Sequence, residues 1–113
     1  MNAAPAAVIN PCHRRVDPAS APNGLIVITR VDKIAEIVTI QNTGATAIDL
    51  TGWTICSLLG SQLHGVLSGT LATGTTLDVP SQAKRAIWNN RDAERAAVYN
   101  SAGELISYWS EGR

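Results

Sequence analysis

The sequence has no long apolar run and no excess of either charge. No stretch approaches the roughly 20 consecutive apolar residues that a membrane-spanning helix requires. Nine Lys and Arg residues balance nine Asp and Glu residues, so the formal net charge is zero. A neutral chain has no overall field that would draw it to nucleic acid or to an anionic membrane. Neutrality also lowers the repulsion between copies, which favours weak homo-oligomerisation.

The residues that carry common enzyme chemistry are scarce. His13 and His64 are the only candidates for the base of a hydrolytic triad, and no G-x-S-x-G elbow accompanies them. The acidic residues are scattered singly, no glycine-rich loop leads into a helix, and no calcium-loop pattern occurs. Together with Cys12 and Cys56, the two histidines match no zinc-binding spacing. We therefore predict no enzyme activity, no metal and no cofactor.

The start of the chain differs in composition from the rest. Four of the five prolines lie there, at positions 5, 11, 18 and 22. Prolines at that density prevent a continuous helix or a central strand. The segment also lacks the basic start and apolar block of a secretion signal. Either the protein is not exported by that route or the chain is a piece of a longer protein, and we favour the piece. We predict a Pro/Ala-rich arm or linker over residues 1–23 and one domain over residues 24–113.

Short apolar stretches alternate with turn residues from residue 24 onward. The expected strands are 25–31, 36–41, 47–50, 66–71, 75–79, 86–88, 95–100 and 104–109. Asn, Gly and Pro between them supply the turn chemistry. Only residues 92–98 offer a helical alternative. Many short strands about ten residues apart predict an all-β sandwich.

The stretch EIVTIQNTGATAIDLTGWTI at residues 36–55 predicts the core. Leu50 and Trp53 are three residues apart, which breaks the strand period of two. A bulge or tight bend at Thr51-Gly52 would return Trp53 and Ile55 to the core face. We expect Trp53 to be the central core residue. The full predicted core set is Val38, Ile40, Ile48, Leu50, Trp53 and Ile55.

Cys12 and Cys56 are the only thiols. By strand parity, Cys56 lies on the face opposite to Trp53 and Ile55, where an arm that carries Cys12 could reach it. A disulfide would close a loop of about 45 residues and contribute about 3–4 kcal/mol. It would also favour an oxidising location, either extracellular or at the cell surface. The alternative, two unpaired thiols, stays open.

The candidate contact residues are aromatic and basic. Tyr108 and Trp109 are neighbours on an expected strand, so one of them should point outward and could contact a partner. Lys84 and Arg85 belong to a set of loop cations that could form a basic patch or lie separately in solvent. The whole set is Arg14, Arg15, Lys84, Arg85, Arg91 and Arg95.

Two blocks, NTG at residues 42–44 and IDLTGWTI at residues 48–55, resemble the lamin tail domain, an immunoglobulin-like module of nuclear lamins with bacterial relatives. The turn at residues 71–74 and the pair Trp88-Asn89 resemble further features of that family. The similarity covers about residues 24–109. It implies an immunoglobulin-like β-sandwich of eight or nine antiparallel strands with Greek-key features, used as a non-catalytic contact or spacer module of a larger protein.

The resemblance implies an unidentified protein or a neighbouring domain as the partner. An accessory nucleic-acid-binding domain that uses the loop Arg and Lys residues is the alternative. No binding residue carries over, because the matching positions shape the fold. Residues 63–66 lack the aromatic residue that is common before the fourth or fifth strand of the family. No coiled-coil heptad precedes the domain, so filament assembly by this chain alone has no support.

Overall fold

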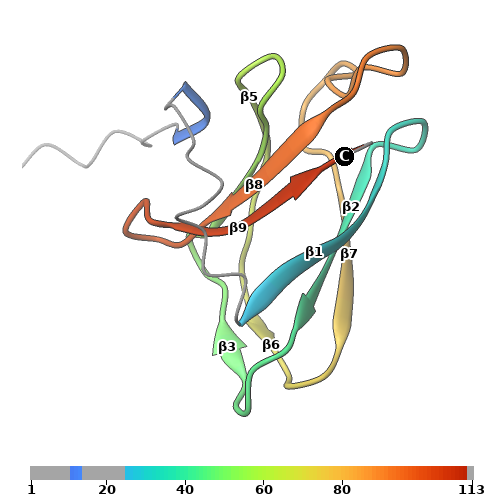
Figure 1. Ribbon diagram of the computed structural model, residues 1–113. Coiled ribbons are helices and arrows are strands. Elements are labelled where there is room, and N and C mark those ends of the chain that lie inside the picture. Colours follow the sequence, from blue (N-terminus) through green and yellow to red (C-terminus); the bar gives the residue numbers. More distant parts are fainter. Residues whose placement is uncertain (1–10, 14–24, 112–113) are drawn as a thin grey trace, which may run out of the picture.

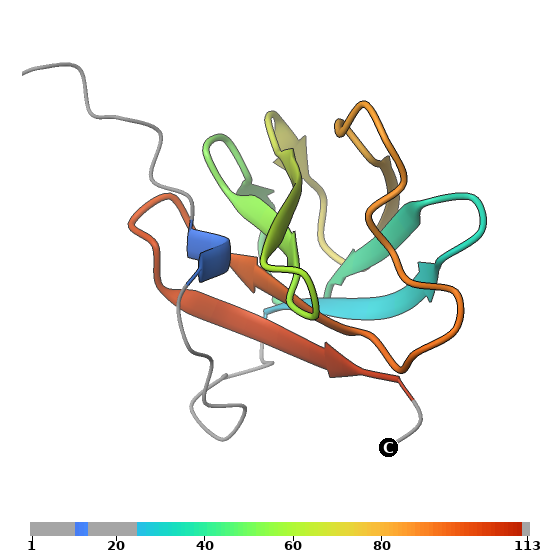
Figure 2. The ribbon, with the colours of Figure 1, turned by 90° about the horizontal axis from the view of Figure 1, so that it is seen from above.

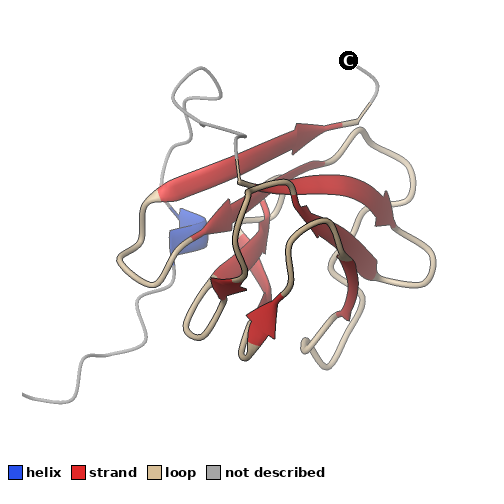
Figure 3. Ribbon diagram, turned by 90° about the horizontal axis from the view of Figure 1, so that it is seen from below, coloured by secondary structure: helices blue, strands red, loops and turns tan. Residues whose placement is uncertain are grey.

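The computed structural model describes residues 11–13 and 25–111 (Figure 1). The elements are a 3₁₀-helix η1 (Pro11–His13) and nine strands, β1 (Ile26–Asp32), β2 (Ile37–Asn42), β3 (Ile48–Asp49), β4 (Thr54–Ser57), β5 (Gln62–Val66), β6 (Thr70–Leu71), β7 (Thr76–Pro80), β8 (Arg95–Tyr99) and β9 (Leu105–Ser110). The expected eight or nine antiparallel strands are thereby confirmed. Apart from η1, the predicted arm lies outside the described residues. The one helix among the described residues is η1, drawn in blue in Figure 3.

The strands form three antiparallel sheets. One has the order β1-β2-β7, the second β5-β4-β8-β9, and the small third pairs β3 with β6. The chain leaves β2 and returns to it only with β7, and it returns to β4 only with β8. Such crossovers are Greek-key features of an immunoglobulin-like sandwich, which confirms the predicted fold class. Figure 2 shows β8 and β9 side by side in the second sheet.

The main core lies between the two larger sheets. Val38 and Ile40 of β2 and Ile55 of β4 are completely buried, and Leu50 and Trp53 are nearly so. Ile48 is half-buried and packs against the margin of this core. Further buried contributions come from Ile26, Ile28, Leu67, Leu71, Val79, Ile87, Trp88, Ala96 and Val98.

A tight turn places Trp53 in the core. The backbone N–H of Trp53 donates to the carbonyl of Leu50 at 2.9 Å. Gly52, the third residue of this turn, has a φ of 83°, which a type II turn requires at that position and which glycine adopts without strain. The three-residue spacing of Leu50 and Trp53 is therefore the signature of a turn between β3 and β4, and both side chains enter the same core.

Two expected strands are wrong in detail. Residues 66–71 form no single strand, because Gly69 with a φ of 83° separates the end of β5 from the start of β6. Residues 86–88 form no strand either. The backbone N–H groups of Ile87 and Trp88 donate to the carboxylate of Glu36 at 2.9 and 3.0 Å instead of to a neighbouring strand. Their apolar side chains nonetheless enter the core.

The helical alternative for residues 92–98 is also wrong, since residues 95–99 form β8. This strand pairs with β4 on one side and with β9 on the other. Its central residues, Ala96, Ala97 and Val98, are buried on both faces. A strand covered on both faces loses the alternation that would distinguish it from a helix in the sequence.

Side chains close the seams between the two larger sheets. At one seam the amide of Gln82 accepts from the N–H of Val66 at 3.1 Å and donates to its carbonyl at 2.9 Å. Gln82 thus imitates a strand residue on the edge of β5. At the other seam the backbone N–H of Ile28 in β1 donates to the hydroxyl of Ser107 in β9 at 3.2 Å. These contacts occupy strand edges that could otherwise pair with another chain.

Replacing Trp53 with Ala should lower the free energy of unfolding by about 3–5 kcal/mol, because the substitution leaves a cavity in the main core. Urea unfolding followed by far-UV circular dichroism measures this change. Ile34→Ala is the control, since Ile34 is 86 % exposed and should change stability by less than about 0.5 kcal/mol. Near-native stability of Trp53→Ala would contradict the assigned core.

Candidate functional site

Cys12 and Cys56 form a disulfide, with their Cα atoms 5.4 Å apart. Cys56 belongs to β4 and faces away from the main core, as strand parity predicts. Cys12 belongs to η1, which contacts β4 and β5. The bridge therefore fastens η1 to the outer face of the four-stranded sheet.

A second apolar cluster surrounds this bridge. The buried members besides the two cysteines are Leu58, Ala97 and Tyr99, and Leu63, Leu105 and Tyr108 pack against them. The outer face of a sandwich sheet is usually solvated and polar. Here η1 covers part of that face, so the sheet is packed on both sides at β4 and β8.

His64 is a structural residue in this geometry. Its ring is completely buried, its Nδ1 lies 2.9 Å from the indole nitrogen of Trp88, and its Nε2 lies 2.7 Å from the carbonyl of Val79. An indole N–H can only donate and a carbonyl can only accept, so Nδ1 is bare and Nε2 carries the proton. Burial lowers the pKa of His64 below its ordinary value of 6.5, although the Val79 carbonyl and the charge of Glu36 act in the opposite direction. A ring with both nitrogens engaged in the interior cannot serve as a base for a bound substrate.

Glu36 ties the β7–β8 loop, residues 81–94, to the β1–β2 hairpin. Its carboxylate accepts from the N–H groups of Ile87 and Trp88, and its own carbonyl accepts from the N–H of Ser81 at 2.9 Å. Glu36 itself has a φ of 61°. A non-glycine residue in this region is uncommon and requires support from its surroundings, which these contacts supply.

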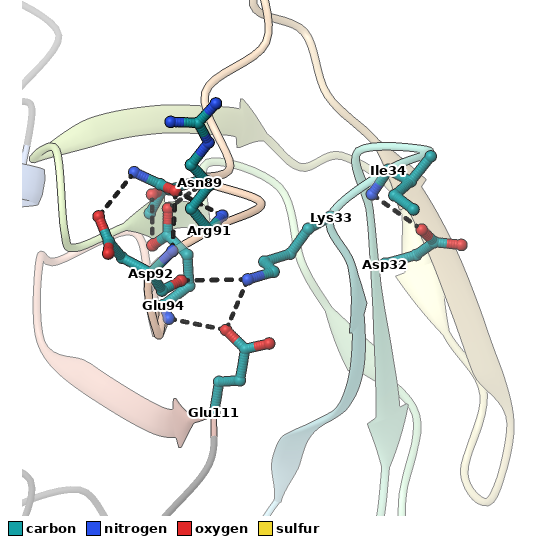
Figure 4. Close-up of polar contacts among 9 residues, drawn as sticks. Asp32, Lys33, Ile34, Asn89, Arg91, Asp92, Glu94 and Glu111 are labelled. Carbon is teal, nitrogen blue, oxygen red and sulfur yellow. Dashed lines mark hydrogen bonds and ion pairs between the residues drawn. The ribbon is translucent and has the colours of Figure 1, made fainter.

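Glu94 organises the end of the same loop from inside the protein. Its side chain is only 1 % exposed, and it accepts from the hydroxyl of Ser57 at 3.0 Å and from the N–H of Asn89 at 2.8 Å. Asn89 in turn accepts from the N–H groups of Arg91 and Asp92. Figure 4 shows this network, with the guanidinium group of Arg91 directed away from the carboxylates.

Lys33 and Glu111 connect β1 to the end of β9. The ammonium group of Lys33 lies 2.8 Å from the carboxylate of Glu111 and donates to the carbonyl of Asp92 at 3.1 Å (Figure 4). The Glu111 carboxylate also accepts from the N–H of Glu94 at 2.8 Å. The Lys33 ammonium, followed by this N–H, holds the pKa of Glu111 below its ordinary value of 4.5. Lys33 is thus engaged in contacts within the fold and is not free to bind a ligand.

Four of the six predicted basic residues lie on the surface of the domain. Lys84, Arg85 and Arg91 lie in the β7–β8 loop, Arg95 begins β8, and all four are exposed. Within the described residues, the only ion pairs are Arg30–Asp32 and Lys33–Glu111. These four cations therefore have no acidic partner in the described part of the fold. Arg14 and Arg15 lie outside the described residues.

The predicted aromatic contacts are less exposed than the basic ones. Tyr108 and Trp109 are both half-buried, on opposite faces of β9. Trp109 packs against the main core, and Tyr108 packs against the cluster around the disulfide. Most of their surface is used within the domain, which leaves the loop cations as the more accessible candidates for contact.

The described residues lack a metal-binding cluster and a membrane-spanning helix. No group of three or more His, Cys, Asp and Glu residues there could hold a metal ion. No helix there is long and apolar enough to cross a membrane.

Two antiparallel sheets, Greek-key crossovers and a closed apolar core define an immunoglobulin-like β-sandwich. A family model described as Lamin Tail Domain matches residues 19–113. The chain belongs to the lamin tail domain family, as its NTG and IDLTGWTI blocks indicate. A search of curated proteins found no match for this chain.

Three residues with large structural roles carry no sequence signal of those roles. Glu36, Gln82 and Glu94 read as ordinary surface residues, because charged and amide side chains are mostly exposed. Glu36 follows a hairpin turn and Glu94 precedes a strand, so each could have been suspected only as a turn or cap residue. Their partners lie 51, 16 and 37 residues away in the chain, for example at Ile87, Val66 and Ser57.

Removing the disulfide should lower the free energy of unfolding by about 3–4 kcal/mol, because its 44-residue span restricts the unfolded chain. Cys12→Ser and Cys56→Ser variants test this by urea unfolding, and Ser110→Ala, at an exposed strand end, serves as the control. Intact mass after alkylation without reduction should show no added group. Two alkylated thiols in the native protein would contradict the pairing.

Acidification should destabilise the domain through His64. Its pKa is lower in the folded chain than the ordinary 6.5, so the stabilisation is complete above pH 6.5 and is lost as the pH falls from 6.5 through the folded value. The loss should not exceed about 1.4 kcal/mol per pH unit. Urea midpoints between pH 7.5 and 5.0 measure the slope.

His64→Gln is the matched variant for this slope, because glutamine does not titrate and can still donate and accept a hydrogen bond. Its stability should change much less between pH 7.5 and 5.0 than that of the unmodified protein. The comparison also removes any contribution from His13, which both proteins contain. An identical pH slope in the two proteins would refute the assignment.

Proposed function

We propose that this domain is a non-catalytic interaction or spacer module of a larger protein. The proposal rests on one observation, namely that the reactive side chains of the described residues make structural contacts. The described histidine ring of His64, the buried Glu94 carboxylate and both sulfurs are all engaged in contacts that hold the fold together. Family membership supports the same view, since the lamin tail domain is an immunoglobulin-like module without catalytic chemistry.

The domain limits and the location form part of this proposal. Residues 24–113 form the sandwich, and residues 1–23 serve as the arm that joins it to a neighbouring domain. The Cys12–Cys56 bridge supports an oxidising location, extracellular or at the cell surface, because such bonds persist mainly there. A disulfide within the arm suits a spacer, since it fastens η1 of the arm to the sandwich.

The hypothesis of an accessory nucleic-acid-binding domain keeps one favourable observation. Lys84, Arg85, Arg91 and Arg95 are exposed and have no acidic partner among the described residues. The weakness of this hypothesis is the formal net charge of zero and the sequence pI of about 6.7, because nucleic-acid-binding domains are usually basic. Titration with duplex DNA at several salt concentrations decides it. Binding through three or four phosphate contacts would give a log–log salt slope of about −3 to −4.

The interaction function is tested with the oxidised, full-length chain. Chemical cross-linking to proteins of the source cell, followed by mass spectrometry, identifies a partner, which is then purified. Isothermal titration should give saturable binding with a defined stoichiometry, and the destabilised Trp53→Ala variant should not bind. A purified chain that turns over substrates in a hydrolase screen, with the rate abolished by His64→Gln, would refute the non-catalytic proposal.

A further inference from the structure

Three connections of the sandwich meet at one end of the domain. They are the β1–β2 turn at residues 33–36, the β4–β5 turn at residues 58–61 and the β7–β8 loop at residues 81–94. Figure 1 shows them together at the top and upper right, on the side opposite β3 and β6. We call this set of three connections, with Arg95, the loop end.

Hydrogen bonds join the three connections into one surface. Lys33 donates to the carbonyl of Asp92 at 3.1 Å, which links the first connection to the third. The backbone N–H of Leu58 donates to the carbonyl of Arg95 at 2.8 Å, which links the second to the start of β8. Glu36 adds two further bonds to the β7–β8 loop. The loop end is therefore organised before any partner arrives, which lowers the entropic cost of binding.

The acidic and basic side chains of the loop end differ in their contacts. The carboxylates of Glu36, Glu94 and Glu111 accept hydrogen bonds from backbone groups, Ser57 or Lys33 within the fold. The cations Lys84, Arg85, Arg91 and Arg95 are exposed and have no acidic partner among the described residues. Asp92 is the one exposed acid of this end, and its carboxylate accepts from the side-chain amide of Asn89 at 3.3 Å. The chain is neutral as a whole, yet this end exposes four cations and one carboxylate.

Apolar side chains are exposed at the same end. Ile34 at the tip of the β1–β2 turn is 86 % exposed, and Leu59 in the β4–β5 turn is 42 % exposed. Neither is needed by the core clusters. Arginine and apolar groups on one surface are a composition typical of protein interfaces, in which charged groups give orientation and apolar groups give buried area.

We propose that the loop end is the docking surface of the module, and that its partner is an acidic protein segment that carries apolar side chains among Asp or Glu residues. The proposal rests on the interaction function proposed above and names the site and partner for it. Arg85 and Arg91 can each bind a carboxylate through two N–H groups. Ile34 and Leu59 receive the apolar side chains of the segment. A protein partner suits this surface better than nucleic acid, because exposed apolar tips add nothing to phosphate contacts and the chain has no overall positive field.

The test uses the oxidised full chain and defined probes. The first probe is a 12-residue peptide of Asp and Glu with three Leu residues, the second has Ser in place of Leu, and the third has Lys in place of the acids. A 12-base-pair DNA duplex is the fourth. Titrations followed by backbone amide NMR shifts at about 100 mM salt report both the affinity and the surface used.

The proposal expects the first peptide to bind most tightly and to shift the amides of residues 33–36, 58–61 and 84–95. Arg85→Gln and Arg91→Gln should each weaken this binding about twofold to fivefold, and the double variant about tenfold. Arg30→Gln makes the same change in net charge at a residue already paired with Asp32. It should therefore leave the affinity within about twofold. Ile34→Ser should reduce the advantage of the first peptide over the second.

Four results would overturn the proposal, the last of them without affecting the interaction function. The first is tighter binding of the duplex than of the first peptide, which assigns the surface to nucleic acid. The second is an equal loss of affinity in Arg30→Gln and Arg91→Gln, which would mean that net charge alone explains the attraction. The third is absence of peptide-induced shifts at the loop end. A purified cross-linked partner that binds with full affinity to the Arg85→Gln/Arg91→Gln double variant would leave the interaction function standing and remove this site alone.

Discussion

The hydrogen bond from the Trp88 indole to His64 is the contact on which the loop end depends. The β7–β8 loop is fourteen residues long and contains no strand, so backbone pairing holds only its first residues, Ser81 and Gln82, to Glu36 and His64. Trp88 anchors it to β5 through His64, and His64 anchors β5 to β7 through the carbonyl of Val79. Glu36 then accepts from the backbone N–H groups of Ile87 and of Trp88 itself. A buried polar network of this kind is stabilising only when every member has a partner, and each of these groups has one.

The disulfide stabilises the outer face of the four-stranded sheet. Residues of β4, β8 and β9 present an apolar outer face, which would be an unfavourable surface for a soluble sandwich. Because η1 is covalently attached there, Cys12 is buried and the face becomes a second small core. One sheet thus has a large cluster between the layers, which includes Ala96, and a small one outside, which includes Ala97.

The parts of this structure that could be predicted from the sequence are those set by local patterns. Alternation in β2 and the turn chemistry of Gly52 were sufficient to place Val38, Ile40 and Trp53 in the core, and strand parity was sufficient to turn Cys56 toward an arm. Local patterns could not reveal that Trp88 is held by a histidine 24 residues away, or that a glutamate replaces a strand as partner of the backbone at residues 87 and 88. Those contacts depend on the crossover of β7 to β2, which brings distant segments together, and no period in the chain encodes it.

The neutral composition also conceals how charge is arranged. Counting charges predicts no preference for an anionic partner, because nine positive groups offset nine negative ones. The fold separates these groups by function. The Glu94 carboxylate accepts from the Ser57 hydroxyl and from the backbone N–H of Asn89. The Glu111 carboxylate pairs with Lys33 and accepts from the backbone N–H of Glu94. Both acids are therefore engaged within the fold. The backbone N–H of Arg91 donates to the side chain of Asn89, and its guanidinium group is directed away from the carboxylates (Figure 4). Screening confines the field of such a group to about 10 Å, so a contact surface can be locally cationic on a molecule that has no charge in total.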